Sequence, residues 1–144
     1  MNTGFVSVVI SSLFLTPFPK ADKVNVPDYE RIQGIWVTVK FYMEGIDGTG
    51  WSQGEAIDIF KDRTKTLKNS LDPKLEIKET FRLDATKCPK RITIIKEDGT
   101  EFQGIYEFDK DFLRIAMSGH PSRPPPESFQ PRPNNIVYIL RFLG

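Results

Sequence analysis

The feature that most constrains the fold is a succession of short, strand-like segments that fills most of the 144-residue chain. Each segment is rich in β-branched or aromatic residues, or alternates apolar with polar side chains, as half-buried strands do. No long segment repeats its apolar residues with the 3.6-residue period of a helix. Strands are predicted at residues 35–43, 56–60, 64–68, 75–83, 91–96, 101–108, 112–117 and 136–142, and a single helical turn is predicted before them, at residues 28–33.

The connections between these segments indicate how the strands are arranged. Short connections favour antiparallel neighbours. The dipeptide Asp98-Gly99 favours positive φ and predicts a type I′ hairpin turn. About eight strands at a spacing of roughly 8–12 residues are typical of a barrel or a sandwich. We therefore expect an all-β fold, an antiparallel up-and-down barrel in which the first and last strands pair.

The first 21 residues differ from the rest of the chain. Residues 5–15 are an apolar run that includes three serines, and Lys20 is the only charged side chain before Asp22. Such a run is too short to cross a hydrocarbon core of ~30 Å as a helix, but it suits the apolar region of a secretory signal peptide. We therefore expect residues 1–21 to be a signal peptide, residues 22–144 to form the barrel domain, and the protein to be secreted or periplasmic. The alternative is a buried first strand or an amphipathic extension.

Composition narrows the classes of partner. The chain has 20 Lys and Arg residues against 19 Asp and Glu residues, and its pI is about 7.8. Domains that bind nucleic acid usually have a pI above roughly 9, so we expect no nucleic-acid partner. Cys88 is the only cysteine and His120 the only histidine, which leaves no set of soft ligands for a metal. We expect no metal and no cofactor.

Carboxylates are the remaining candidates for acid–base chemistry. Asp109 and Asp111 flank a predicted turn, and Asp58 lies in a predicted strand. Carboxylates at such positions are usually solvated. Glu79 is the one polar residue on the apolar face of the segment at 75–83. None of these residues forms a recognisable catalytic pair, and we expect the protein not to be an enzyme.

Several short motifs occur in an order that resembles a known family. Gly34 and Trp36, after the helical turn and at the start of the first strand, resemble the G-x-W signature of the lipocalins. The stretch from Ile32 to Arg141, about three quarters of the chain, is similar to an uncharacterised lipocalin-like domain family expanded in planctomycete bacteria. The resemblance implies a lipocalin-like barrel and no particular activity. The motifs that carry it are Gln33-Gly34-Ile35-Trp36, Leu83-Asp84, Cys88-Pro89-Lys90-Arg91-Ile92, Gly104-Ile105-Tyr106-Glu107, Leu113-Arg114-Ile115-Ala116, Arg123-Pro124 and Leu140-Arg141.

The same resemblance implies a structural signature made of Gly34, Trp36 and Arg141. Gly34 would leave room for the chain to enter beneath the barrel, and Trp36 would close that end. Arg141 would stack on the indole, a cation–π contact worth roughly 0.5–2 kcal/mol. The alternative is that Trp36 is an ordinary core residue and Arg141 points to solvent.

Two loops hold the candidate contact residues. Trp51 lies in a glycine-rich loop after the first strand, where we expect it to cover the barrel mouth. The loop at residues 120–133 contains Arg123, Phe129 and six of the eleven prolines. We expect it to be a stiff connector, with a partner-facing surface or a lid as alternatives.

Two functions are compatible with these patterns. The first is the binding of a small apolar or amphipathic ligand, with Trp51, Arg123 and Phe129 as candidate contacts. The second is a structural or protein-interaction domain with a filled barrel core. A continuous apolar cavity of ~300 Å³ or more would favour the first function, and a core packed to native density would favour the second.

Overall fold

The computed structural model describes residues 26–51 and 53–144, so the predicted signal peptide lies outside the described residues. The chain divides into two units, of which the first ends at Arg31 and the second spans Ile32–Gly144. Helix α1 (Asp28–Arg31) lies in the first unit. It begins after Pro27, whose carbonyl oxygen accepts hydrogen bonds from the backbone N–H groups of Glu30 and Arg31. The predicted helical turn is confirmed.

The second unit is an all-β domain in which every predicted strand is present. The additional strand β3 lies in the segment predicted to be a flexible loop. The strands are β2 (Gly34–Met43), β3 (Ile46–Asp47), β4 (Ala56–Lys61), β5 (Thr64–Asn69), β6 (Asp72–Asp84), β7 (Arg91–Ile95), β8 (Glu101–Asp109), β9 (Phe112–Ser118) and β10 (Asn135–Phe142).

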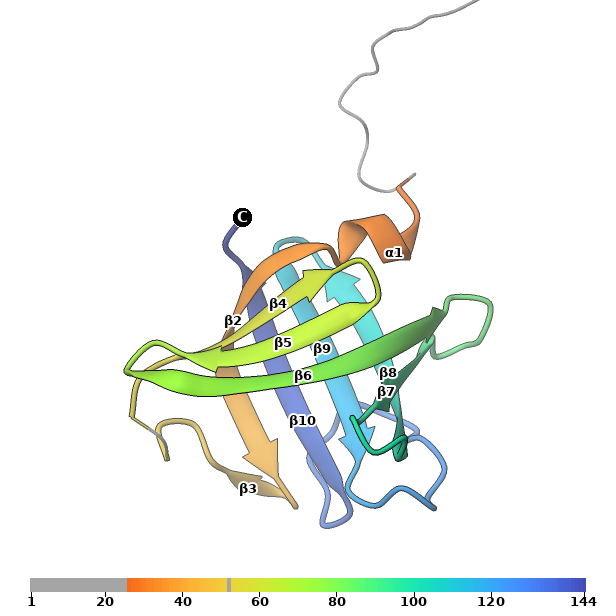
Figure 1. Ribbon diagram of the computed structural model, residues 1–144. Coiled ribbons are helices and arrows are strands. Elements are labelled where there is room, and N and C mark those ends of the chain that lie inside the picture. The colour runs from red at the N-terminus through yellow and green to blue at the C-terminus, as the bar shows by residue number, and fades with distance from the viewer. Residues whose placement is uncertain (1–25, 52) are drawn as a thin grey trace, which may run out of the picture. The chain divides into compact units, whose positions relative to one another are not determined.

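The strands form a closed, antiparallel barrel of eight strands, with β3 as an extension. Neighbours along the chain pair in order from β4 to β10, and β2 pairs with β4 on one side. The barrel closes because β10 pairs with both β9 and β2, and Figure 1 shows β10 (blue) between these two strands. In the closing ladder Ile136 lies opposite Met43, and Phe142 lies opposite Trp36. The predicted up-and-down barrel, with its first and last strands paired, is confirmed.

The β7–β8 connection is a tight hairpin of a different type from the predicted one. Gly99 has φ +89°, but Asp98 does not have positive φ, so the turn is not type I′. The backbone N–H of Lys96 donates to the carbonyl oxygen of Thr100 at 2.8 Å, which closes a loop of three residues. The Asp98 carboxylate accepts a hydrogen bond from the backbone N–H of Thr100 at 2.9 Å and stabilises this longer loop.

One end of the barrel interior is filled with aromatic rings. Trp36, Phe60, Phe81 and Tyr106 are each at most 2% exposed. The rings of Phe60 and Phe81 meet edge to face, with centroids 5.2 Å apart. The indole Nε1–H of Trp36 donates a hydrogen bond to the carbonyl oxygen of Ile32 at 2.8 Å, so the one polar atom of this side chain is satisfied. This end of the barrel has a packed core with no need of a ligand.

The predicted stack of Arg141 on Trp36 is wrong, because the structure places Phe142 on the indole. The Phe142 ring lies 5.0 Å from the Trp36 ring at an angle of 65°. Arg141 is exposed and lies opposite Val37, which puts its side chain on the other face of the sheet. The alternative, an ordinary core tryptophan and an arginine in solvent, describes the structure.

A β-bulge in β2 is the physical reason for this difference. Ile139 lies opposite Lys40, but the next residue, Leu140, lies opposite Thr38, so Val39 has no partner. Without the bulge Arg141 would lie opposite Thr38, on the same face as Trp36. A shift of one residue reverses the face of every following side chain.

Gly34 gives a direct test of how tightly this end is packed. It has φ +125°, and a Cβ atom there would lie 2.7 Å from Cε1 of Phe142 and 2.9 Å from the carbonyl oxygen of Gly144. We expect Gly34→Ala to lower the free energy of unfolding by about 2–3 kcal/mol, through backbone strain and overpacking together. Urea unfolding measures this loss.

Gly50→Ala is the matched control for that experiment. Gly50 also has positive φ, +88°, but among the described residues beyond its two chain neighbours no heavy atom lies within 4 Å of its Cβ position. Only backbone strain acts there, so the loss should be smaller, about 1 kcal/mol. Equal losses in the two variants would contradict a steric role for Gly34.

Candidate functional site

The other half of the barrel interior contains charged side chains, which we call the interior charge cluster: Asp58 on β4, Lys65 on β5 and Glu79 on β6. Lys65 Nζ lies 3.0 Å from Asp58 Oδ1 and 3.3 Å from Glu79 Oε1. Asp58 and Glu79 are 5% and 7% exposed, and the Lys65 side chain is 14% exposed. The cluster is therefore held almost entirely out of water.

Strand alternation and register bring these three residues together. Asp58 lies two residues from both Ala56 and Phe60 on β4, so its side chain shares the inner face with theirs. Lys65 lies directly opposite Phe60 on β4 and opposite Glu79 on β6. One lysine therefore stands between two carboxylates on three neighbouring strands.

Burial and mutual attraction set the protonation of the cluster. Burial raises the pKa of Asp58, and the neighbouring Lys65 ammonium only partly offsets this effect. Burial lowers the pKa of Lys65, but the charges of Asp58 and Glu79 outweigh it, so this pKa is raised overall. For Glu79, burial is outweighed by Lys65 and Lys96, and its pKa is lowered. Burial raises the pKa of Tyr138, a neighbour of the cluster, to about 12.

Aromatic side chains continue from the cluster toward the chain segment after β3. The rings of Tyr138 and Phe41 lie 5.4 Å apart, and Phe41 meets Trp51 edge to face at 6.4 Å. Gly48 permits this contact, because a Cβ atom there would lie 2.9 Å from both the Phe41 and the Trp51 rings. Trp51 nevertheless remains 59% exposed.

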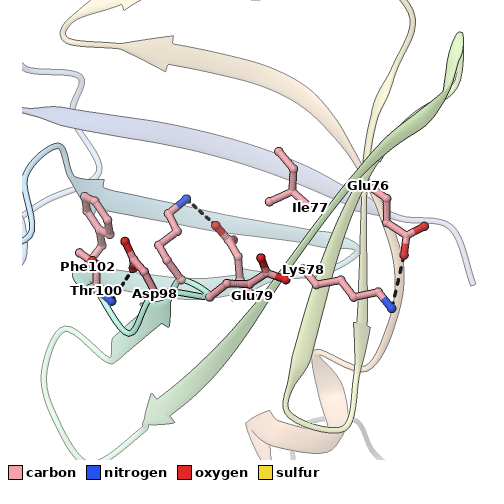
Figure 2. A pocket seen from close by; sticks show the side chains of 9 residues that line it. Glu76, Ile77, Lys78, Glu79, Asp98, Thr100 and Phe102 are labelled. Atoms are coloured by element: carbon pink, nitrogen blue, oxygen red, sulfur yellow. Dashed lines mark hydrogen bonds and ion pairs between the residues drawn. The ribbon is translucent and has the colours of Figure 1, made fainter.

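A hollow of about 840 Å³ opens beside Glu79. It exists because β6 pairs with β7 only from Thr80 to Asp84, so the first half of β6 leaves a gap before the β7–β8 hairpin. Figure 2 shows Ile77 and Glu79 of β6 and, across from them, Asp98, Thr100 and Phe102 of the hairpin. The full lining is Glu76, Ile77, Lys78, Glu79, Lys96, Glu97, Asp98, Thr100 and Phe102.

Lys96 connects the hollow to the interior charge cluster. Its Nζ lies 2.5 Å from Glu79 Oε2 and 5.6 Å from the centroid of the Phe102 ring. Its side chain is 46% exposed, whereas Glu79 is buried. Glu79 is therefore ion-paired to two ammonium groups, that of Lys65 inside the barrel and that of Lys96 at the rim.

The contact residues predicted from the sequence, Trp51, Arg123 and Phe129, do not line the hollow. Asp58 was expected to be solvated and is instead buried in the interior, which corrects that expectation. Asp109 and Asp111 are exposed, as expected. Glu79 was noted as the polar residue on an apolar face, which is the signal of an inward-facing charge. Lys65, Lys96 and Tyr138 were missed, although Lys65 follows a two-residue connection that fixes its register with β4.

The loop at residues 120–133 contributes Phe129 to the outer face of the barrel, and none of its residues lines the hollow. Phe129 and Tyr42 pack against an outer-face cluster of buried residues. The guanidinium of Arg114 lies 5.4 Å from the Phe129 ring centroid. Arg123 is exposed, and its backbone N–H donates to the carbonyl oxygen of His120. Neither Phe129 nor Arg123 lines the hollow, so neither forms a lid over it. The outer-face cluster is Ile105, Ala116 and Val137.

Residues 26–51 and 53–144 contain neither a candidate metal site nor a helix that could cross a membrane. No group of three or more His, Cys, Asp or Glu residues there could hold a metal ion. No helix in this part of the chain is long and apolar enough to cross a bilayer.

Comparisons of the chain with protein-family models, with curated proteins and with solved structures found no match. The function therefore has to be inferred from the residues of the barrel itself.

Proposed function

We propose that this chain is an exported, lipocalin-like barrel that binds a small amphipathic ligand in the hollow beside Glu79, and that it is not an enzyme. One observation carries the proposal: an open hollow of about 840 Å³ borders a charge cluster buried inside the barrel. Binding sites for small molecules are commonly ~300–1,000 Å³ in volume.

The cost of buried charge supports a role in binding. Removing charged groups from water costs several kcal/mol per ion, and well-packed apolar residues of similar volume are often at least as stable. An eight-stranded barrel can fill its interior with side chains, as the end around Trp36 does. The half around Asp58, Lys65 and Glu79 instead keeps charges beside an opening. For a barrel with a purely structural role, an apolar interior of the same volume would serve as well.

The walls of the hollow favour an amphipathic ligand over a purely apolar one. Ile77 and Phe102 supply apolar surface, while most other lining side chains are charged. A purely apolar ligand would remove water from Glu79 and Lys96 without replacing its hydrogen bonds, which is costly. A ligand with an apolar body and one polar end avoids this cost.

Two parts of this proposal, that the protein is exported and that it is lipocalin-like, are supported by the sequence. The apolar run at residues 5–15 supports a signal peptide, and a secreted or periplasmic location follows from it. The motif of Gly34 and Trp36, together with the order of the strands, supports a lipocalin-like domain similar to the family expanded in planctomycetes.

A neutral amphipathic fluorescent probe, dansylamide, which has an apolar naphthalene ring and a polar sulfonamide end, tests ligand binding in the hollow. We expect its emission to increase with the native chain, and we expect Ile77→Glu to weaken binding at least ~10-fold, because burying an isoleucine side chain is worth about 1.5–3 kcal/mol. Ile35→Glu is the matched control: Ile35 is 40% exposed and Ile77 41%, but Ile35 does not line the hollow. Equal affinities in the two variants would contradict binding in the hollow.

The second candidate is a structural or protein-interaction domain. It is favoured by large apolar side chains that remain exposed at Ile46, Trp51 and Leu71, which are 61%, 59% and 67% accessible. Absence of probe binding to the native chain would favour this candidate over the first.

A further inference from the structure

The rim of the hollow already holds an ammonium group, that of Lys96. Its Nζ lies against Glu79 Oε2 and faces the ring of Phe102 at 5.6 Å. A carboxylate and the face of an aromatic ring both attract a cation, and together they define a position for one. The ammonium comes from the residue after β7, on a side chain that is 46% exposed.

Lys96 is the replaceable member of the cluster. The Lys65 ammonium is buried and ion-paired to both Asp58 and Glu79, so its removal would take away the cation that Asp58 pairs with and leave Glu79 with Lys96. Lys96 contacts Glu79 alone within this set, and its half-exposed side chain can turn into water at little cost. When it does, the interior is left with two carboxylates and one ammonium, and another cation is needed in its place.

The rest of the rim also disfavours an anion. Glu76, Glu97 and Asp98 line the hollow together with Glu79, against only two lysines, Lys78 and Lys96. A carboxylate or phosphate entering the hollow would meet this excess of negative charge. An incoming cation would be attracted by it.

The geometry points to a protonated amine with a small alkyl or aryl body as the ligand, its ammonium replacing that of Lys96 between Glu79 and Phe102, and its apolar body lying on Ile77. This inference rests on the proposed function, since it names the class of ligand for the same hollow. Lys96 is then a tethered competitor, which occupies the cation position until a free amine displaces it.

Isothermal titration of the full chain at pH 7 with three probes of equal length tests the inference: hexylamine, hexanol and hexanoate. We expect hexylamine to bind at least ~10-fold more tightly than the other two. Tighter binding of hexanoate, or equal binding of hexylamine and hexanol, would overturn the amine inference and leave ligand binding in place. Absence of binding by all three would overturn the inference together with the proposed function.

Variants of the rim test the role of Lys96 separately. Lys96→Met keeps most of the unbranched side chain but removes the competing ammonium. It should raise the affinity for hexylamine ~10-fold and change the affinity for hexanol little. Lys78→Met is the matched control, because Lys78 also lines the hollow but pairs with Glu76, and its effect should stay below ~3-fold. Unchanged hexylamine affinity in Lys96→Met would overturn the competitor role.

Two further variants remove the groups that hold the cation. Glu79→Gln should abolish the preference for hexylamine over hexanol. Glu79 is buried, so its replacement also affects folding. Phe102→Leu provides a second test on a less buried residue, and it should lower the affinity for hexylamine more than the affinity for hexanol. An undiminished amine preference in Phe102→Leu would contradict the proposed position of the cation.

Discussion

Trp36→Ala is expected to lower the free energy of unfolding by about 3–5 kcal/mol, as buried aromatic-to-alanine changes do. The side chain is 2% exposed and packs on Phe142 at 5.0 Å and on Phe108 at 6.2 Å. The variant would leave a cavity in the filled end of the barrel. It would also remove the hydrogen bond from the indole to the carbonyl oxygen of Ile32. Urea unfolding with a common m value measures the loss.

The neighbouring residue provides the control. Ile35 lies next to Trp36 on β2 but is 40% exposed, so Ile35→Ala should cost less than about 1 kcal/mol. Similar losses in the two variants would show that the strand as a whole, and not the indole, is responsible.

A double-mutant cycle identifies which side chain Trp36 depends on. Trp36 and Phe142 are in contact. The double variant Trp36→Ala/Phe142→Ala should therefore lose about 0.5–2 kcal/mol less free energy of unfolding than the two single variants lose in total. Trp36→Ala and Arg141→Ala should be additive, because Arg141 is exposed on the other face. Coupling to Arg141 in place of Phe142 would contradict the register described for β2 and β10.

The barrel was predictable because its signals are local. Alternation within each segment locates a strand, and short connections force consecutive strands to pair. Even the polar strand β5 (Thr64–Asn69) can be predicted, because only two residues separate it from β4 and such a short connection favours pairing of the two strands. Closure follows once the number of strands and their alternating direction are known, since an unpaired first and last strand would leave two exposed edges.

The partner of Trp36 was not predictable, because it depends on a non-local detail. The bulge at Val39 changes which residue at the end of β10 shares a face of the sheet with Trp36. Nothing in the local sequence of β2 marks Val39 as the unpaired residue, since valine is an ordinary strand residue. A single bulge therefore decides between Arg141 and Phe142.

The site was predictable only in part. Glu79 stood out on an apolar face, and the position of Asp58, two residues from both Ala56 and Phe60, carries the same signal of an inward-facing charge. The hollow depends on where β6 separates from the β7–β8 hairpin. That separation is a property of the curved sheet and of the length of β6, which the spacing of residues does not reveal.

Lys65→Met is expected to cost about 3–5 kcal/mol at pH 7, the loss seen when one partner of a buried ion pair is removed. Methionine fills a similar space, but it leaves Asp58 and Glu79 buried without their shared cation. Lys68→Met is the control on the same strand. Lys68 pairs with Glu76 at 3.3 Å, but both side chains are more than 40% exposed, so its loss should be below about 1 kcal/mol.

Acidification should narrow the difference between the native chain and Lys65→Met. In the native chain the lowered pKa of Glu79 contributes stability that is present above its ordinary value of 4.5 and is lost as the pH falls through the lowered value. The raised pKa of Asp58 acts in the opposite direction, because the folded chain takes up that proton more readily than the unfolded chain. Without Lys65, Asp58 loses its cation and Glu79 keeps only Lys96. The pKa values of both carboxylates are then higher than in the native chain, so the folded variant takes up protons more readily than the native fold does as the pH falls. Its stability relative to the native chain therefore increases as the pH falls from 7 toward 4. Urea unfolding at pH 7, 6, 5 and 4 measures this convergence. A difference that stays constant over this range would show that Lys65 stabilises the barrel through the packing of its aliphatic chain and not through its charge.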